Sequence, residues 1–287
     1  LFRGEGARAN GWRMRAERAI EDPQLDCVER GYLLLPTAQI RLDAGDHQAA
    51  YDCSVDAAAI GERFSEPDLV AVARHLQGRA RLEQGKIAEG LCLLDEAMVA
   101  VAERELSPVV TGLIYCSVIE GCRDVHALER AHEWTTALHC WCEEQPDMVA
   151  FTGLCRVHRA ELMQFHGAWA DALTEAERAV ERCRNVNERA AAAACYQQGE
   201  VHRLRGEFAA AEEAYRNASR TGWEPQPGLA LLRMAQGRGP AAAATIRRVV
   251  AASARARERA QLLPACVEIM LATGDLAEAR RASAELA

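Results

Sequence analysis

Cysteine and histidine side chains crowd one stretch in the middle of the sequence, where they could bind a metal ion or act as nucleophiles. The stretch contains His132, His139, Cys140, Cys142, Cys155, His158 and His166. A zinc site needs four converging ligands, normally supplied as spaced pairs. Cys155 and His158 share a face if their segment is helical, because they are three residues apart, whereas Cys140 and Cys142 diverge.

Only one such pair is therefore available, and we expect no metal, no cofactor and no catalytic residue. Buried thiols and half-buried histidines, with at most one oxidation-sensitive cysteine, are the expected reading. The segment GRGPAA (237–242) imitates a nucleotide-binding fingerprint, but it follows a helical pattern instead of a strand. We therefore expect that the chain is not an enzyme, and a metal- or thiol-dependent enzyme is kept as a remote alternative.

Composition excludes several other classes of protein. The 287 residues carry a formal net charge of −8, which disfavours direct contact with a nucleic-acid phosphate backbone. The eleven scattered cysteines indicate reduced thiols and a cytoplasmic protein, and no apolar run approaches the length of a membrane span. The first residue is Leu1, so we expect the chain to be an excerpt of a longer protein.

The elements that position these side chains are predicted from an internal repeat. The stretch YQQGEVHRLRGEFAAAEEAYRNA (196–218) has a glycine at Gly206, followed by small residues five and twelve positions later. The same spacing recurs along the chain around a residue that we call the turn residue. The eight turn residues are Gly4, Gly45, Gly85, His126, Gly167, Gly206, Gly237 and Gly274, separated by 41, 40, 41, 41, 39, 31 and 37 residues.

Each repeat is predicted to be a pair of helices joined at the turn residue. Glycine at the end of a helix can adopt the left-handed conformation. The small residue five positions later lets the two helices approach closely, as does a small residue seven positions before the turn. A single pair cannot bury its apolar face, so neighbouring pairs must stack. The segment TGWEPQPG (221–228) coincides with the shortest step, and its prolines predict an irregularity there.

This spacing resembles the tetratricopeptide repeat, whose standard length is about 34 residues. The fold we predict is all-α, a right-handed superhelical solenoid of about eight tetratricopeptide-like helix pairs with a period near 40 residues. We expect residues 1–287 to form a single continuous array that is truncated at both ends.

Longer strings are similar to a more specific family. They are RGYLLLPTAQIRLDAGD (30–46), LLDEAMVAVAERELSPVVTGLIYCSVIEGC (93–122), WCEEQPDMVAFTGLCRVHRAELMQFHGAWADAL (141–173) and YQQGEVHRLRGEFAAAEEAYRNASRTGWEPQPGLALLRMAQGR (196–238). Together they resemble the helical-repeat region of actinobacterial LuxR-type transcriptional regulators. That resemblance implies a regulatory module for an attached helix-turn-helix domain, whose DNA-reading motif is absent from these residues.

The expected partner is a protein, a peptide or a small-molecule effector in a concave groove. DNA would be contacted only through the absent helix-turn-helix domain, no membrane is involved, and a homodimer stays open. The alternative is a stand-alone protein-interaction scaffold. In tetratricopeptide-like arrays the groove is lined ten, six and three positions before each turn. The residues predicted to bind there are His75, Arg79, Cys116, Glu120, Glu161, Tyr196, Glu200 and Arg203.

A column of glutamates in the middle repeats would suit a basic peptide or a cationic ligand, with Tyr196 as an aromatic anchor. The simpler interpretation is that Glu120 with Arg123, and Glu200 with Arg203, only neutralise each other three residues apart on a solvated face.

Overall fold

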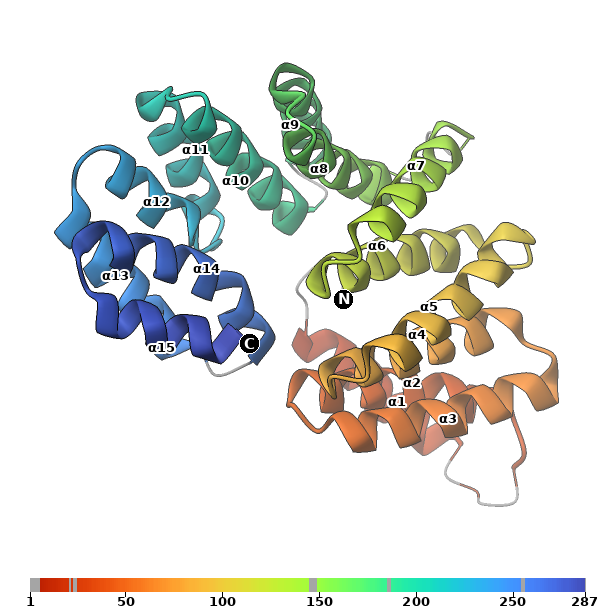
Figure 1. The fold of residues 1–287 in the computed structure, drawn as a ribbon. Helices are drawn as coiled ribbons and strands as arrows, with labels where there is room; N and C mark the ends of the chain where they lie inside the picture. Colours follow the sequence, from red (N-terminus) through yellow and green to blue (C-terminus); the bar gives the residue numbers. More distant parts are fainter. Residues whose placement is uncertain are drawn as a thin grey trace. The chain divides into compact units, whose positions relative to one another are not determined.

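The computed structural model describes residues 6–20, 22, 25–144, 149–184, 187–253 and 256–286, and every regular element in these ranges is an α-helix. The chain divides into two compact units, Leu1–Leu138 and His139–Ala287. The prediction of one continuous array stays a prediction. Figure 1 shows the helices coloured along the chain.

The first unit contains α1 (Gly6–Ala19), α2 (Glu29–Asp43), α3 (His47–Phe64), α4 (Pro67–Glu83), α5 (Ile87–Ala102) and α6 (Pro108–Asp124). Helix α7 (Leu128–Glu144) crosses the border between the units. The second unit contains α8 (Val149–Phe165), α9 (Trp169–Cys183), α10 (Glu188–Leu204), α11 (Phe208–Arg220), α12 (Gly228–Ala235), α13 (Gly239–Ala252), α14 (Ala256–Thr273) and α15 (Leu276–Leu286).

The predicted turn residues lie where the helices are joined. Gly45, Gly85, Gly167, Gly206, Gly237 and Gly274 all have positive φ, between 75° and 83°. His126 replaces glycine in this register and also adopts positive φ, 58°. The prediction of a turn at each of these seven positions is confirmed, and Gly4 lies outside the described residues. The side chain of Asp46 caps α3 by accepting a hydrogen bond from the backbone N–H of Ala49 at 3.3 Å.

The small residues of the repeat are buried between paired helices. Five positions after the turn stand Ala50, Gly90, Ala131, Ala172, Ala211, Ala242 and Ala279, all of them buried. Seven positions before it, Ala38, Gly78, Ala160, Gly199 and Ala230 are buried as well. Side chains this small allow the close helix approach that the repeat predicts. Twelve positions after the turn residue, the first and last repeats carry Ala16 and Leu286. Both are exposed, so the pattern weakens at the two ends of the chain.

Within each unit, the contacts between helices distinguish the even-numbered helices from the odd-numbered ones. Consecutive helices pack on one another from α2 to α6 in the first unit and from α8 to α15 in the second. Among the described residues, the main contacts between helices two apart join even-numbered helices: α2 with α4 and α4 with α6, then α8 with α10, α10 with α12 and α12 with α14. We call these two sets the even-helix rows. They match the predicted first helices of each pair.

The short step between Gly206 and Gly237 comes from a short helix. Helix α12 has only 8 residues, against 17 for α10. The proline-containing segment before it ends α11 at Arg220 and delays the start of α12 until Gly228. The predicted irregularity at this segment is confirmed within the second unit.

Candidate functional site

In the first unit, two of the predicted site residues meet at the contact between α4 and α6. His75 Nε2 lies 2.5 Å from Ser117 Oγ, and Arg79 Nη1 donates a hydrogen bond to the same oxygen at 2.9 Å. A guanidinium can only donate, so Ser117 Oγ accepts from Arg79, and the same hydroxyl is hydrogen-bonded to the His75 imidazole. The three side chains thus form a polar joint in the even-helix row.

The protonation state of His75 is fixed by its surroundings. Its side chain is 4% exposed, and burial, together with the positive charge of Arg79, lowers its pKa to about 3. The imidazole is therefore neutral near pH 7, and its contact with Ser117 is a hydrogen bond between two uncharged groups. A base with so low a pKa removes protons poorly at neutral pH.

The other two predicted residues of this unit lie on α6. Cys116 is buried, whereas Glu120 is half-buried. The side chain of Glu120 has no hydrogen bond or ion pair with another described residue. A Cβ added to Gly121, the next residue, would lie 3.6 Å from Arg79 Cδ, so the Arg79 stem passes beside this segment. Glu120 is accordingly the predicted carboxylate that is left to contact a ligand.

In the second unit, the predicted residues on α10 are tied to neighbouring helices. Glu200 accepts hydrogen bonds from Tyr215 on α11 and from Arg203 Nη2, the latter at 2.7 Å. The hydroxyl of Tyr196 accepts a hydrogen bond from the Gly228 backbone N–H at 3.3 Å. Burial and the nearby Glu200 charge raise the pKa of both tyrosines. These bonds stabilise the contacts of α10 with α11 and α12. The Glu200–Arg203 pair of the simpler interpretation is present, but its side chains are only 12% and 17% exposed, so the pair does not lie on a solvated face.

Glu161 and its neighbourhood on α8 are also engaged. Glu161 Oε2 lies 3.5 Å from Nδ1 of the buried His158. One turn later, Gln164 accepts a hydrogen bond from Gln197 Nε2 on α10. The α8–α10 contact is therefore another polar joint in an even-helix row.

The cysteine and histidine side chains of the middle stretch contact different partners and do not converge on one site. His139 contacts Arg159, and His166 Nδ1 lies 2.8 Å from the carbonyl oxygen of Leu162. Cys155 is hydrogen-bonded to Cys142; this bond and burial raise the pKa of Cys155, which keeps the thiol protonated and weakly nucleophilic. In the part of the chain that the structure describes, no group of three or more His, Cys, Asp or Glu residues could hold a metal ion.

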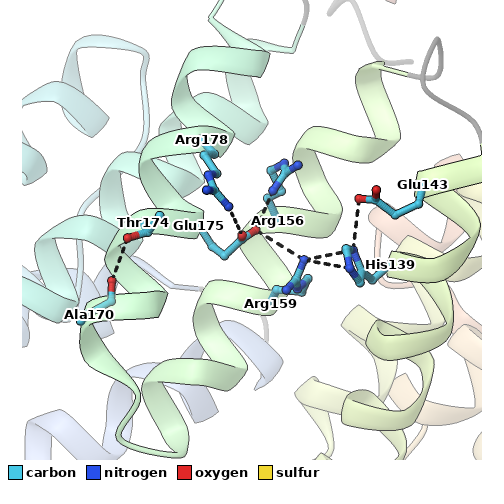
Figure 2. A network of polar contacts seen from close by, with 8 residues as sticks. All are labelled: His139, Glu143, Arg156, Arg159, Ala170, Thr174, Glu175 and Arg178. Atoms are coloured by element: carbon cyan, nitrogen blue, oxygen red, sulfur yellow. Dashed lines mark hydrogen bonds and ion pairs between the residues drawn. The ribbon is translucent and has the colours of Figure 1, made fainter.

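Ser117, Tyr215 and Glu175 take part in polar contacts that the sequence did not single out. Glu175 on α9 is 6% exposed and lies among Arg156, Arg159 and Arg178 (Figure 2). The sequence did contain a signal for Glu175, which stands eight positions after the turn residue Gly167. The equivalent positions of other repeats carry Cys53, Leu93, Trp134 and Ala214, so a carboxylate there is exceptional.

Comparisons with known proteins bear on the fold. No protein-family model and no curated protein matches the chain. A similar solved structure is the crystal structure of BtubC (BKLC) from P. vanneervenii, with a TM-score of 0.57 and 21% sequence identity. The match covers 77% of this chain and 92% of that protein, and it shows a shared all-helical, repeat-like fold. Among the described helices, none is both long and apolar enough to cross a bilayer.

Proposed function

We propose that the chain is a regulatory binding module whose even-helix rows receive a protein, a peptide or a small-molecule effector. The observation that carries the proposal is the polar joint between α4 and α6, where His75 and Arg79 share Ser117, which lies three residues before Glu120 on the same face of α6. The Glu120 carboxylate has no partner among the described residues, so it is available to pair with a cationic ligand. The favoured ligand for this row is therefore a basic peptide or a small cation.

Regulation would follow from the position of the joint between two helices. A ligand that contacts both α4 and α6 favours the spacing of these helices in which it binds best. It can shift the array only by the difference between its affinities for the two spacings. The right-handed solenoid of about eight tetratricopeptide-like pairs is the architecture in which we expect such a shift to be passed along. The similarity of fold to BtubC supports a repeat architecture and does not specify a ligand.

We propose further that this module belongs to a LuxR-type transcriptional regulator in the cytoplasm and modulates an attached helix-turn-helix domain. This step depends on the resemblance of the sequence strings quoted above. The second candidate is a stand-alone interaction scaffold, for which the same rows would bind a partner without a DNA-binding domain. The natural reading frame after residue 287 discriminates between them, because a basic helix-turn-helix supports the first and a stop codon contradicts it.

The binding function itself is tested with a peptide panel. Fluorescently labelled peptides that differ only in the number of Lys and Arg residues are titrated with the protein at two salt concentrations, and fluorescence anisotropy is measured. We expect saturable binding that strengthens with peptide charge and weakens at higher salt. Equal affinity for basic and acidic peptides would contradict a carboxylate-based site.

A further inference from the structure

Three arginines in the second unit surround a single buried carboxylate. Arg156 Nη1 lies 2.9 Å from Glu175 Oε2, and Arg159 Nη1 lies 3.7 Å from the same oxygen. Arg178 Nη1 lies 3.1 Å from Glu175 Oε1. Figure 2 shows the three guanidinium groups, from α8 and α9, converging on this carboxylate.

The charges in this cluster do not balance. Glu175 neutralises one of three guanidinium charges, and it is too buried to be screened by water, with 6% of its side chain exposed. Arg156 and Arg159 are also largely enclosed, with 24% and 22% exposed. The cluster thus holds two excess formal positive charges, one enclosed between Arg156 and Arg159 and one on Arg178, whose side chain is 58% exposed, in a protein whose formal net charge is −8.

The neighbouring α7 does not supply the missing negative charge at close range. Its His139 accepts a hydrogen bond from Arg159 Nη1, 3.0 Å from Nδ1, and burial and the Arg159 charge lower the pKa of this imidazole. Glu143 lies 3.8 Å from His139 Nδ1, with its side chain 67% exposed, so its charge is largely solvated. His139 therefore orients Arg159 as a neutral acceptor.

The arginines keep donors available for a ligand. A guanidinium has five N–H groups, and the described residues engage few of them: one contact on Arg156, one on Arg178, and Glu175 and His139 on Arg159. Arg156 and Arg159 both lie near the same oxygen of Glu175. One oxygen of an anionic ligand could therefore contact both guanidinium groups. Glu175 and His139 orient these guanidinium groups before a ligand binds. This lowers the side-chain conformational entropy that is lost on binding.

We propose that Arg156, Arg159 and Arg178 form a binding site for a phosphoryl group. A phosphate monoester carries close to two negative charges at neutral pH and offers three acceptor oxygens, which matches both the excess charge and the guanidinium geometry. Glu175 and His139 are positioning residues in this site. The site uses none of the residues of the proposed even-helix binding function, so either can fail without the other.

The test is a titration of the intact chain with inorganic phosphate at constant ionic strength, with chloride and acetate as the competing salts. Isothermal calorimetry and the melting temperature both report binding. We expect saturable binding of phosphate with a rise in melting temperature that neither chloride nor acetate produces. Binding of phosphate no tighter than acetate would overturn the proposal.

Variants separate a ligand site from a purely structural cluster. The double variant Arg156→Gln/Arg159→Gln should lose at least tenfold in phosphate affinity, while Arg156→Lys/Arg159→Lys should keep part of it because the charge remains. Glu175→Gln removes the competing negative charge but keeps an amide oxygen that accepts from the arginines, so it should bind phosphate more tightly than the native chain. The control Arg216→Gln removes an exposed arginine paired with Glu213 and should change nothing.

Circular dichroism confirms that each variant remains helical before its affinity is compared. Weaker binding by Glu175→Gln, or unchanged binding by the folded Arg156→Gln/Arg159→Gln variant, would overturn the proposal. A phosphoserine peptide and glycerol 3-phosphate then distinguish a protein-borne from a small-molecule phosphoryl group. Tighter binding of either one than of inorganic phosphate supports the site, and binding of neither contradicts it.

Discussion

Gly78 on α4 and Gly90 on α5 touch through their backbones. A Cβ added to Gly78 would lie 3.0 Å from the Gly90 carbonyl oxygen, and a Cβ added to Gly90 would lie 3.0 Å from the Gly78 carbonyl oxygen. The side chain of Leu94 closes the same space, 2.8 Å from the Cβ position of Gly78. This helix pair therefore depends on the absence of a side chain at the two positions where other repeats carry alanine or glycine.

Replacing Gly78 with alanine should destabilise the first unit. Alanine is the better helix former by about 1 kcal/mol, but overpacking a closed interior costs about 1–3 kcal/mol, and here backbone and Leu94 must both move. We expect a net loss of about 1 kcal/mol, measured by urea denaturation. Gly11 in α1 has no atom near its Cβ position, so Gly11→Ala is the matched control and should stabilise the protein. A stabilising Gly78→Ala would show that the two helices are not in close contact.

His126 is the one turn residue of the repeat that is not glycine, and it is exposed with φ of 58°. A side chain in the left-handed region costs about 1–2 kcal/mol, partly offset because glycine gains more freedom when unfolded. His126→Gly should therefore raise the free energy of unfolding by up to about 1 kcal/mol. His126→Ala is the control and should have little effect or be slightly destabilising. A loss of stability in the glycine variant would mean that the imidazole makes a contact worth more than the strain.

The turn positions could be predicted because glycine spacing is a local property of the sequence. The spacing also predicted a turn at His126, where no glycine is present. It predicted as well that the small residues of the repeat lie where paired helices are in contact. The handedness of a solenoid is not fixed by such spacing, since it depends on small rotations between successive pairs.

The binding residues were harder to predict because their partners are distant in sequence. Glu200 stands in the register of a groove residue, but Tyr215 on α11 donates a hydrogen bond to it and Gly228 leaves room for both side chains. Arg156 and Arg159 were visible as an i, i+3 pair of charges, yet only the packing of α9 shows that they share Glu175. The helical register gives the face of a residue, whereas its partner is decided by tertiary contacts.

His75 should make the stability of the first unit depend on pH. Its folded pKa of about 3 lies below the ordinary value of 6.5, so protonation favours the unfolded chain. The stabilisation is therefore complete above pH 6.5 and is lost as the pH falls towards 3. Between pH 7 and pH 5 this residue should contribute a loss of about 2 kcal/mol.

The measurement compares native protein with His75→Gln, which keeps a polar partner for Ser117 but cannot be protonated in this range. Urea unfolding at pH 7 and pH 5 should give a smaller pH-dependent loss for the variant. His139→Gln is a useful second variant, because the pKa of that imidazole is also lowered. Identical pH dependence of the native protein and His75→Gln would contradict a buried, neutral His75.

The central claim is that the even-helix row of the first unit binds a cationic ligand through Glu120. The most direct measurement is the affinity of the best basic peptide from the panel for the native protein, for Glu120→Lys and for Glu129→Lys. Glu129 is an exposed glutamate on α7, also without a partner among the described residues, and it provides a change of equal charge away from the row. The account predicts at least a tenfold loss of affinity for Glu120→Lys and less than a twofold change for Glu129→Lys, with helicity retained in both. Equal losses in the two variants, or none in either, would contradict it.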